Sequence, residues 1–327
     1  MVDGTYFVVG GAGFIGSHFC DRLLEGGARQ VTVYDNFVSG REWHLADHAG
    51  DPRFRLIRGE VADLDALSGA MRGHDAVIHL ASNADLARAV ADPSVDFHSG
   101  TYLTHQVVEA MRLSSTSTIL YASGSGVYGD LGTTEVHEDH GPLIPVSTYG
   151  ASKLAGEALI AAYCHMFDMR GCAFRFGNVV GPRQTHGVGY DFIRRLREEP
   201  GRLRVLGDGS QSKPYVYVDD VVSAVLRAHE VAPSTGLPFR AYNVATDDTV
   251  TVREIALLAL DCLGRDPATT RLEFGTEPRG WKGDVPIVRL NTERIRSIGW
   301  THTRSSRQAM IDSMRAIATD NRVGGAS

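Results

Sequence analysis

Short apolar runs alternate with helical patterns through the first 180 residues of the chain. Each of six apolar runs predicts a β-strand, and they lie at residues 5–9, 30–35, 53–61, 75–82, 117–123 and 172–178. Between the runs, apolar residues recur at helical spacing around residues 19–24, 102–111 and 154–163. Regular alternation of strands and helices is typical of a doubly wound parallel sheet with helices on both faces. The pattern therefore predicts an α/β fold of this type.

The second half of the chain opens with a region punctuated by proline and glycine and is less regular. Its predicted elements are a helix around 192–196, a strand and helix at 215–229, a strand at 241–245 and a helix at 252–263. We expect the strand near 241–245 to return to the main sheet. Residues 1–180 are interpreted as one domain and residues 181–327 as a second, smaller mixed α/β domain.

Composition narrows the classes of function. Of the 327 residues, 43% are hydrophobic and 22% are charged, as in an ordinary globular protein. The formal net charge of -6 argues against general binding to nucleic acid or to an anionic membrane surface. No apolar run is long enough to span a bilayer and no signal-peptide pattern is visible, so we expect a cytoplasmic protein. The four cysteines show no paired spacing and are interpreted as free thiols.

A glycine-rich turn follows the first predicted strand. Gly10, Gly13 and Gly16 lie in GGAGFIGSH, where glycine allows a tight turn and lets the backbone approach a pyrophosphate at the start of a helix. The second strand ends in Asp35, whose carboxylate can accept hydrogen bonds from an adenosine ribose and would repel a 2′-phosphate. The nearby Arg41 could instead hold that phosphate. We give the carboxylate more weight, so the pattern predicts NAD bound in a Rossmann-type domain.

The stretch STYGASK carries a candidate catalytic pair. Tyr149 and Lys153 lie four residues apart in a predicted helix, so both side chains share one face. A phenol with its ordinary pKa near ~10 is a poor base at neutral pH. A neighbouring ammonium group and the positive ring of oxidised nicotinamide favour the phenolate and lower that pKa. Tyr149 is therefore predicted to take a proton from a sugar hydroxyl while hydride leaves the same carbon for NAD.

These and further motifs resemble those of one enzyme family. They are GGAGFIG, YDN, HLAS, VYG, YGASK, RFGNVVGPR, LGDGSQSKPYVYVDD and the late WKGDV, and they span nearly the whole chain. The chain is similar to the NAD-dependent sugar-nucleotide epimerases and dehydratases of the extended short-chain dehydrogenase/reductase family, and most to the UDP-glucose 4-epimerases. The resemblance implies reversible 4-epimerisation of a nucleoside-diphosphate hexose, UDP-linked, through a transient 4-keto sugar. NAD would stay bound through the cycle.

The resemblance also implies which residues hold the cofactor. Those that would cradle the pyrophosphate are Gly10, Gly13, Phe14 and Ile15. Those that would hold the adenosine ribose are Asp35, Asn36, Ser39 and Gly40. Those that would flank the adenine are Glu60 and Val61, and those along the middle of the cofactor are Leu80, Ala81 and Ser82. Glu60 is a mild departure, because the family usually has aspartate there.

On the substrate side, the resemblance implies that Asn178 touches the nucleotide diphosphate and that Arg279 and Lys213 bind its phosphates. Lys213 replaces a family arginine, which keeps the charge but loses the bidentate fork. His186 would line the sugar or uridine pocket, and a purely structural loop histidine is an equally weighted alternative. No cluster of His, Cys and Asp has metal-ligand spacing, so no metal is predicted.

Two alternatives to a 4-epimerase stay open. One is a dehydratase or 4-keto reductase of the same family; its dehydratases typically carry an Asp-Glu pair where this chain has Ser125 and Gly126. The other is a non-catalytic NAD-sensing regulator, a class that commonly loses the Tyr/Lys pair that this chain keeps. The family also implies a homodimer with a four-helix interface, formed here by the helices around 102–111 and 152–166.

One departure from the family lies in YASGSGVYG, residues 121–129. The family has a serine or threonine three residues before the valine of VYG, and its hydroxyl bonds the reacting sugar hydroxyl. This chain has Gly124 there, flanked by Ser123 and Ser125. Ser125 could turn in as a substitute, a water could fill the space, or Tyr149 could act unaided, and both serines could simply satisfy the backbone. We favour Ser125 over Ser123 as the substitute.

Overall fold

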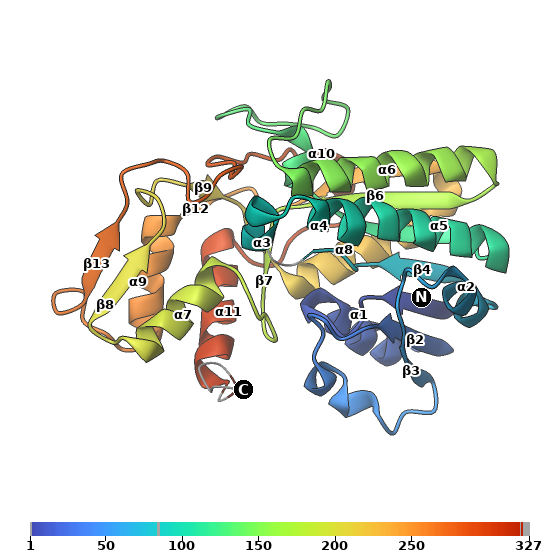
Figure 1. Ribbon diagram of the computed structural model, residues 1–327, viewed down its shortest axis with the longest axis horizontal. Coiled ribbons are helices and arrows are strands. Elements are labelled where there is room, and N and C mark those ends of the chain that lie inside the picture. The colour runs from blue at the N-terminus through green and yellow to red at the C-terminus, as the bar shows by residue number, and fades with distance from the viewer. Residues whose placement is uncertain (1, 84–85, 321, 323–327) are drawn as a thin grey trace.

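The computed structural model describes residues 2–83, 86–320 and 322. Its centre is a seven-stranded sheet in which all neighbouring strands are parallel (Figure 1). From one edge to the other, the strands are β11 (Phe239–Val244), β6 (Arg170–Phe176), β5 (Thr118–Gly124), β4 (Ala76–His79), β1 (Thr5–Val9), β2 (Gln30–Asp35) and β3 (Phe54–Arg58). This order confirms the predicted doubly wound sheet. The strand order reverses between β1 and β4, which is where ligands bind in sheets of this kind.

Helices cover both faces of the sheet. On one face they are α1 (Phe14–Glu25) and α8 (Val218–Val231), and on the other α2 (Leu64–Met71), α5 (Leu103–Ser114) and α6 (Thr148–Met166). Strand β1 shows why both faces of the sheet are covered, because its successive side chains point to opposite faces. Tyr6 and Val8 join the core under α1 and α8, whereas Phe7 and Val9 join the core on the other face. Burial on both faces explains why the predicted strands are apolar almost throughout.

The remaining elements form a second lobe at the left of Figure 1. Its helices are α7 (Val188–Glu198), α9 (Val252–Cys262) and α11 (Ser306–Thr319). Its strands pair as β8 (Arg202–Val205) with β13 (Arg271–Phe274), β9 (Ser212–Lys213) with β12 (Val250–Thr251), and β7 (Asn178–Val180) with β10 (Tyr215–Tyr217). This lobe buries its own core around Ile193, Leu258 and Met310. Phe14, at the start of α1, also belongs to that core and so joins the two lobes.

Short elements complete the chain. The helical ones are α3 (Leu86–Ala91), α4 (Ser94–Asp96), the π-helix η3 (Phe97–Tyr102) and α10 (Glu293–Ser297). The 3-10 turns are η1 (Glu42–His44), η2 (Ala46–His48), η4 (Ser125–Tyr128) and η5 (Ala232–Thr235). Four of these, α3, α4, η3 and η4, follow β4 and β5 at the carboxyl edge of the sheet, where the candidate site lies.

The observed elements differ from the sequence pattern mainly outside the sheet. The strand expected near 241–245 pairs with β6 at the edge of the main sheet, as β11. Helices α2 and α11 were not predicted, because each buries only a narrow apolar stripe: α11 buries Met310, Met314 and Ile317 among polar residues. The division into two domains at residue 180 stays a prediction.

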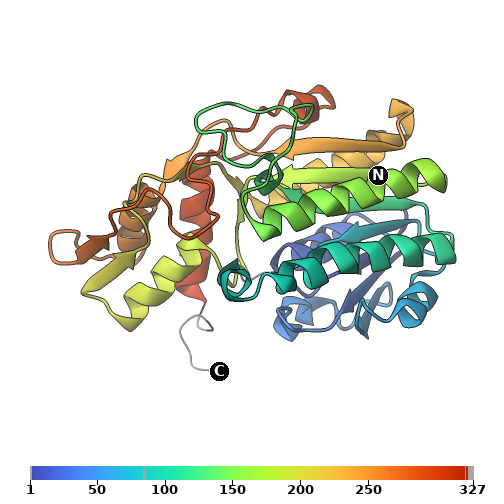
Figure 2. The same cartoon turned by 45° about the horizontal axis from the view of Figure 1, so that its top comes forward.

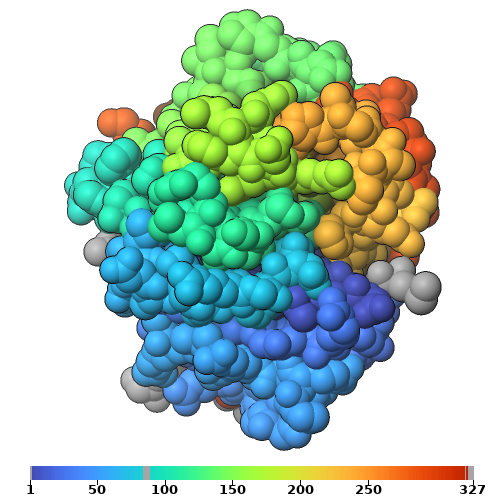
Figure 3. Space-filling view, turned by 90° about the vertical axis from the view of Figure 1, so that its right-hand side faces the viewer, coloured from blue at the N-terminus to red at the C-terminus, as the bar shows by residue number. Residues whose placement is uncertain are grey.

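Helices α5 and α6 run side by side along an outer face of the molecule (Figures 2 and 3). Near the ends of these helices, Leu113 is 44% and Met166 is 70% exposed. None of the described helices is both long enough and apolar enough to cross a membrane. The four cysteines are free thiols, as expected.

Candidate active site

The glycine-rich turn between β1 and α1 is built of backbone packed against backbone. Gly10 has a φ of +82°, and a Cβ there would lie 2.8 Å from the backbone nitrogen of Ala81. A Cβ on Gly16 would lie 2.5 Å from the carbonyl oxygen of Gly10. Both positions therefore require glycine. Helix α1 begins at Phe14, and its N-cap is Gly13, which has no side chain to cover the first N–H groups. Those N–H groups are open to an anion such as a pyrophosphate.

Asp35 ends β2 beside this turn. One carboxylate oxygen accepts a hydrogen bond from the Ala12 N–H at 2.9 Å, and the other accepts one from the Phe37 N–H at 2.8 Å. The residue is 7% exposed; burial raises the pKa of its carboxyl above the usual value, and the two hydrogen bonds oppose that rise. A Cβ on Gly40 would lie 2.8 Å from the carboxylate. The backbone thus holds Asp35 where the ribose of a dinucleotide lies in this fold.

The other residues of the adenosine side lie on the loops that follow β2 and β3. Asn36 donates a hydrogen bond to Glu60 Oε2 at 3.0 Å, although Glu60 itself is exposed. Arg41 donates to the carbonyl oxygens of Ser39 and Gly40 at 3.2 and 3.0 Å. Its guanidinium group is therefore engaged with its own loop, which favours the carboxylate over the arginine as the group that selects the cofactor.

The segment after β4 borders the glycine-rich turn. The N–H groups of Leu80 and Ala81 both donate to the Val9 carbonyl oxygen, at 2.9 and 3.2 Å. Ser82 follows, and these three residues are partly exposed, whereas Val61 is buried. The glycine turn, the carboxylate and this segment all lie at the carboxyl ends of neighbouring strands. Together they fit a dinucleotide laid across the reversal between β1 and β4.

Helix α6 carries the candidate catalytic pair. Ser147 caps the helix by accepting a hydrogen bond from the Gly150 N–H at 3.1 Å. Lys153 is 3% exposed, and its Nζ donates to the Ala122 carbonyl oxygen at 2.8 Å. The same Nζ lies 5.6 Å from the centre of the Tyr149 ring. Tyr149 and Lys153 are thus adjacent beside the end of β5, as the spacing in the sequence predicts.

Burial controls the ionisation of this pair. It raises the pKa of Tyr149 to about 12, while a side-chain hydrogen bond with Ser82 lowers this pKa and the charge of Asp96 raises it. Burial lowers the pKa of Lys153 to about 8, and the charges of Glu157 and Asp96 oppose that shift. At neutral pH the protein alone therefore holds a neutral phenol beside a protonated lysine.

A buried polar network lies behind Lys153. One turn further along α6, Glu157 accepts hydrogen bonds from Ser123 at 2.5 Å and from Arg175 at 2.7 Å. The Arg175 and Glu157 side chains are only 6% and 5% exposed. Arg175 also donates to the Tyr128 hydroxyl at 2.9 Å. Both charges can be buried here because each is paired and hydrogen-bonded.

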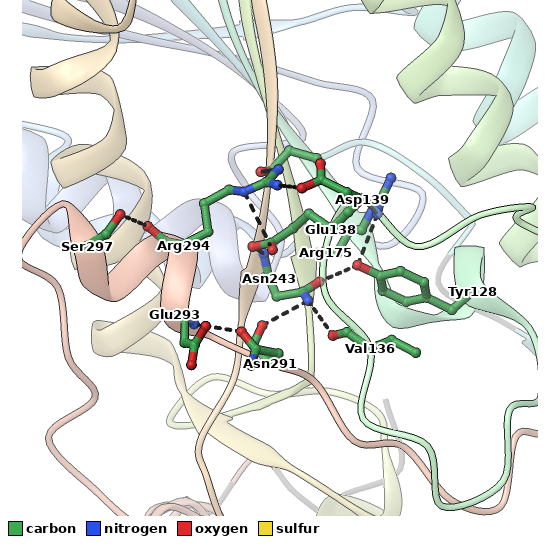
Figure 4. Close-up of polar contacts among 11 residues, drawn as sticks. Tyr128, Val136, Glu138, Asp139, Arg175, Asn243, Asn291, Glu293, Arg294 and Ser297 are labelled. Carbon is green, nitrogen blue, oxygen red and sulfur yellow. Dashed lines mark hydrogen bonds and ion pairs between the residues drawn. The ribbon is translucent and has the colours of Figure 1, made fainter.

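Figure 4 shows how this network continues beyond Arg175. Tyr128 donates a hydrogen bond to Asn243 Oδ1 at 2.7 Å, and the Asn243 N–H donates to Glu138 at 2.7 Å. The Glu138 carboxylate pairs with Arg294 at 3.6 Å. The network therefore ties α6 to β6, β11 and α10, and it holds in place the helix that carries the candidate catalytic pair.

Ser123, Gly124 and Ser125 occupy three different environments. Ser123 is 4% exposed, and its hydroxyl is turned toward Glu157 in the buried network. Gly124 ends β5 with extended backbone, and apart from its chain neighbours no described heavy atom lies within 4 Å of where a Cβ would stand. Ser125 begins η4 and is partly exposed. The role of Ser125 as a substitute hydroxyl stays a prediction.

The candidate phosphate-binding cations both contact one aspartate, Asp284. Lys213 Nζ lies 2.6 Å from Asp284 Oδ1, and the Arg279 guanidinium donates to the backbone carbonyl of the same aspartate. Arg279 also pairs with Asp130 at 2.6 Å. Asp284 is 5% exposed. The protein alone therefore satisfies both cations with its own acidic and carbonyl groups.

The loop that carries Arg279 and Asp284 packs against the start of α6. A Cβ on Gly283 would lie 3.2 Å from the Cβ of Ser147, the N-cap of α6. Asn178 opens β7 next to Lys213, because its N–H donates to the Pro214 carbonyl oxygen at 3.0 Å. His186 is exposed on the loop before α7, and its place in a sugar or uridine pocket stays a prediction.

Sequence reasoning missed the partners of these groups. Glu157 follows Lys153 at the same interval at which Lys153 follows Tyr149, so helical spacing alone could have placed all three on one face. The pairing of Arg279 with Asp130 has no such signal, since it joins segments 149 residues apart. Within the part of the chain that the structure describes, no three His, Cys, Asp or Glu side chains gather as a metal site.

Comparisons with known proteins agree with this geometry. The family model described as the NAD dependent epimerase/dehydratase family matches residues 6–245. Over 300 residues the chain is 34% identical to a UDP-glucose 4-epimerase of Mycolicibacterium smegmatis, and the match covers 90% of this chain and 92% of that protein. Over 319 residues it is 32% identical to a dTDP-glucose 4,6-dehydratase of Streptomyces griseus, with coverage of 91% and 94%.

A solved structure extends the match to three dimensions. The crystal structure of a UDP-galactose 4-epimerase superimposes with a TM-score of 0.85 at 35% identity, and the match covers 96% of this chain and 98% of that one. The glycine turn and the Tyr149–Lys153 pair lie within the residues that the family model matches. The glycine-rich turn, the Tyr149–Lys153 pair and the overall fold agree with these matches. The chain therefore belongs to the NAD-dependent epimerase/dehydratase family, and its cofactor is NAD.

Proposed function

We propose that this enzyme interconverts the two C4 epimers of a UDP-linked hexose. The observation that carries the proposal is the Tyr149–Lys153 pair, beside which the described carboxylates, Asp96 and Glu157, are already engaged in hydrogen bonds. Such a pair can move one proton to and from a sugar hydroxyl. Among the residues that the structure describes, no unengaged acid stands beside the pair to expel a second hydroxyl as water. The chemistry available is therefore oxidation and re-reduction at one carbon, which inverts that carbon.

Each residue of the pair has a defined task. Tyr149 takes the proton of the C4 hydroxyl and later returns it, so it must act as a phenolate. Lys153 supplies a positive charge beside the phenol, and its hydrogen bond to the Ala122 carbonyl oxygen keeps that charge in place. The glycine turn and Asp35 would hold NAD, which when bound would supply the hydride acceptor and donor for C4 and a positive charge beside the phenol.

The substrate diphosphate would be held by Lys213 and Arg279, with Asn178 beside them. Both cations are paired with acidic or carbonyl groups in the protein alone, and a diphosphate offers stronger acceptors for the same donors. Holding the substrate at its diphosphate leaves the sugar free to turn. A 4-keto sugar can therefore present its opposite face before it is reduced.

A 4,6-dehydratase is the main rival, since one relative carries that name at similar identity. Dehydration needs an acid that protonates the leaving hydroxyl. Ser125 and Gly126 stand at the positions where the dehydratases of the family typically carry an Asp-Glu pair. The carboxylates that act electrostatically on the pair are Asp96 and Glu157. Asp96 already accepts from Asn83 and Thr148, and Glu157 is bound in the buried network, so neither is free for this task.

We further propose that two copies pair through α5 and α6. The exposed apolar side chains of Leu113 and Met166 on these helices would be covered by the partner copy. Sedimentation at micromolar concentration should give the mass of a dimer, and Met166→Glu should shift the population toward the monomer. A monomeric mass for the unmodified protein would contradict this.

The experiment that tests the function is product identification. The purified protein is incubated separately with UDP-glucose, UDP-galactose, UDP-N-acetylglucosamine, UDP-glucuronic acid and dTDP-glucose, and the products are assigned by NMR. We expect inversion at C4 of at least one UDP-sugar without net consumption of NAD. Tyr149→Phe is the control, since it should hold NAD and form product at least about a hundredfold more slowly. A 4-keto-6-deoxy product, or no turnover with any of these sugars, would contradict the proposal.

A further inference from the structure

The position where the family keeps a catalytic hydroxyl is open in this protein. Gly124 has no side chain, and a Cβ built there would meet only open space. The hydroxyl of Ser123, the preceding residue, donates a hydrogen bond to the buried Glu157. A phenolate at Tyr149 would nevertheless need a hydrogen-bond donor, because it has to form in a site where burial disfavours charge. A donor from another part of the site would meet that need.

Ser82 follows the end of the strand next to β5. Strands β4 and β5 pair in parallel from Ala76 with Thr118 to His79 with Tyr121. β4 ends at His79 and Ser82 lies at a bend after it, while β5 continues past Tyr121 to Gly124. Neighbouring strands lie about 5 Å apart. Ser82 and Gly124 therefore both lie at the carboxyl edge of the sheet, after the last paired residues of neighbouring strands.

The segment that carries Ser82 is held at this edge. The N–H groups of Leu80 and Ala81 both donate to the Val9 carbonyl oxygen after β4 has ended, so the chain stays bound to the end of β1 as far as Ala81. Asn83, the next residue, donates to the buried Asp96 at 2.8 Å, and Asp96 accepts at 2.6 Å from Thr148, which precedes Tyr149. Ser82 is therefore anchored on both sides, and the residues next to Ser82 and Tyr149, Asn83 and Thr148, share the carboxylate of Asp96. This places the Ser82 side chain by that of Tyr149, where its hydrogen bonding lowers the pKa of the phenol.

We propose that Ser82 is the catalytic hydroxyl of this enzyme and donates a hydrogen bond to the Tyr149 phenolate in place of the residue missing at position 124. The inference rests on the proposed function for its role in turnover. A donor to a phenolate stabilises the charged form more than the neutral phenol and so makes Tyr149 a stronger acid. It also fixes the direction in which the phenolate oxygen points. Supplying the hydroxyl from the segment after β4, and not from position 124 on β5, leaves the other contacts of Tyr149 and Lys153 as they are.

The first test is Ser82→Ala in the NAD-loaded enzyme. We expect kcat to fall about ten- to a hundredfold, with KM and bound NAD little changed, as for the loss of one positioned donor in the transition state. The acid limb of the kcat profile should also move to higher pH, because the phenolate has lost a stabilising partner. Ser234→Ala is the matched control: its hydroxyl is exposed and bonds only the Val231 carbonyl oxygen. An unchanged kcat in Ser82→Ala overturns the proposal.

A second pair of variants tests whether the place of the hydroxyl is what matters. In the Ser82→Ala background, Gly124→Ser should restore part of kcat, since the new hydroxyl enters the same space from β5 and meets no steric obstacle. In the unmodified background, Gly124→Ser should change kcat little. A rise of tenfold or more there would show that the site lacks a hydroxyl that Ser82 does not supply. A fall in Ser125→Ala with Ser82→Ala unaffected would move the role to Ser125.

A measurement without substrate separates this inference from the proposed function. With ring-labelled tyrosine, NMR follows the titration of Tyr149 in the NAD-bound enzyme, and Tyr149→Phe identifies its signal. We expect a higher pKa for Tyr149 in Ser82→Ala than in the unmodified enzyme. Equal pKa values overturn the inference whatever the substrate proves to be. If the pKa rises but no UDP-sugar is epimerised, the proposed function fails and the contact between Ser82 and Tyr149 stands.

Discussion

The two sides of the active site hold their binding groups in different ways. On the cofactor side, backbone holds the main groups: the glycine turn packs backbone against backbone, and two backbone N–H groups hold Asp35. On the substrate side, the candidate cations Lys213 and Arg279 are held mainly by acidic side chains. A site held by backbone is already formed before its ligand arrives. Groups held by ion pairs must exchange their acidic partners for the ligand when it binds. We therefore expect such groups to affect the affinity for substrate more than the stability of the fold.

The largest expected effect lies where the two sides meet. Tyr149→Phe removes the hydroxyl to which we assign proton exchange with the sugar but keeps the ring beside Lys153. We expect kcat to fall about 10²- to 10⁴-fold, the usual contribution of a positioned acid–base group. The content of NAD and the thermal midpoint should change little. Loss of NAD together with activity would instead assign Tyr149 mainly to cofactor binding.

The difference between the two sides also explains how far sequence could reach. The turn at Gly10 and the carboxylate of Asp35 are local features next to predicted strands, so their place follows from the strand pattern. Tyr149 and Lys153 are four residues apart on one helix, which is local as well. The pairing of Arg279 with Asp130 depends on tertiary packing between distant segments. No local pattern carries that information.

The position of the hydroxyl beside Tyr149 shows the same limit. Along one strand, Ser123 and Ser125 were the visible substitutes for Gly124. Ser82 becomes visible only in the folded chain, where Asn83 and Thr148, the residues next to Ser82 and Tyr149, share the carboxylate of Asp96. Side-chain roles that depend on such tertiary contacts therefore require the structure.

The next largest effect should be on the cofactor side. Asp35→Ala removes the acceptor for the ribose hydroxyls and also frees the Ala12 and Phe37 N–H groups. We expect affinity for NAD to fall about ten- to a hundredfold, as for losing charge-assisted hydrogen bonds. Affinity for NADP relative to NAD should improve, because the negative charge that repels a 2′-phosphate is gone. Isothermal titration with both nucleotides measures this, and equal or tighter NADP binding by the unmodified protein would contradict the role of Asp35.

On the substrate side, the effect should be smaller and should appear in KM. Lys213→Gln and Arg279→Gln remove a charge but keep a hydrogen-bond donor, so the buried Asp284 keeps partners. We expect KM for the UDP-sugar to rise about tenfold with kcat nearly unchanged, the signature of lost ground-state binding. Lys282→Gln is the matched control, an exposed lysine in the same loop. A rise in KM for the control equal to that of the two variants would remove the specific role of these cations.

The smallest effect concerns Lys153 and the stability of the NAD-free protein. Its pKa is lowered by burial from 10.5 to about 8. Between these values the unfolded chain holds a proton that the folded protein has released, so this lysine makes the free energy of unfolding rise with pH. The slope is at most about 1.4 kcal/mol per pH unit. Burial raises the pKa of Cys164 and Cys172, which lowers the free energy of unfolding as pH rises through the same window, so the difference between two proteins isolates the lysine. In urea unfolding, the free energy of unfolding of the unmodified protein minus that of Lys153→Met should rise with pH; parallel curves would place the pKa of Lys153 near its ordinary value.

The measurement that tests the central claim most directly follows one hydrogen atom. UDP-glucose labelled with deuterium at C4 is incubated with the enzyme, and the label is located in the product by NMR. Oxidation and re-reduction at one carbon predict that the deuterium stays on C4 of UDP-galactose. Deuterium at C6 of a 4-keto-6-deoxy sugar, or loss of the label to solvent, would contradict 4-epimerisation as the function of this site.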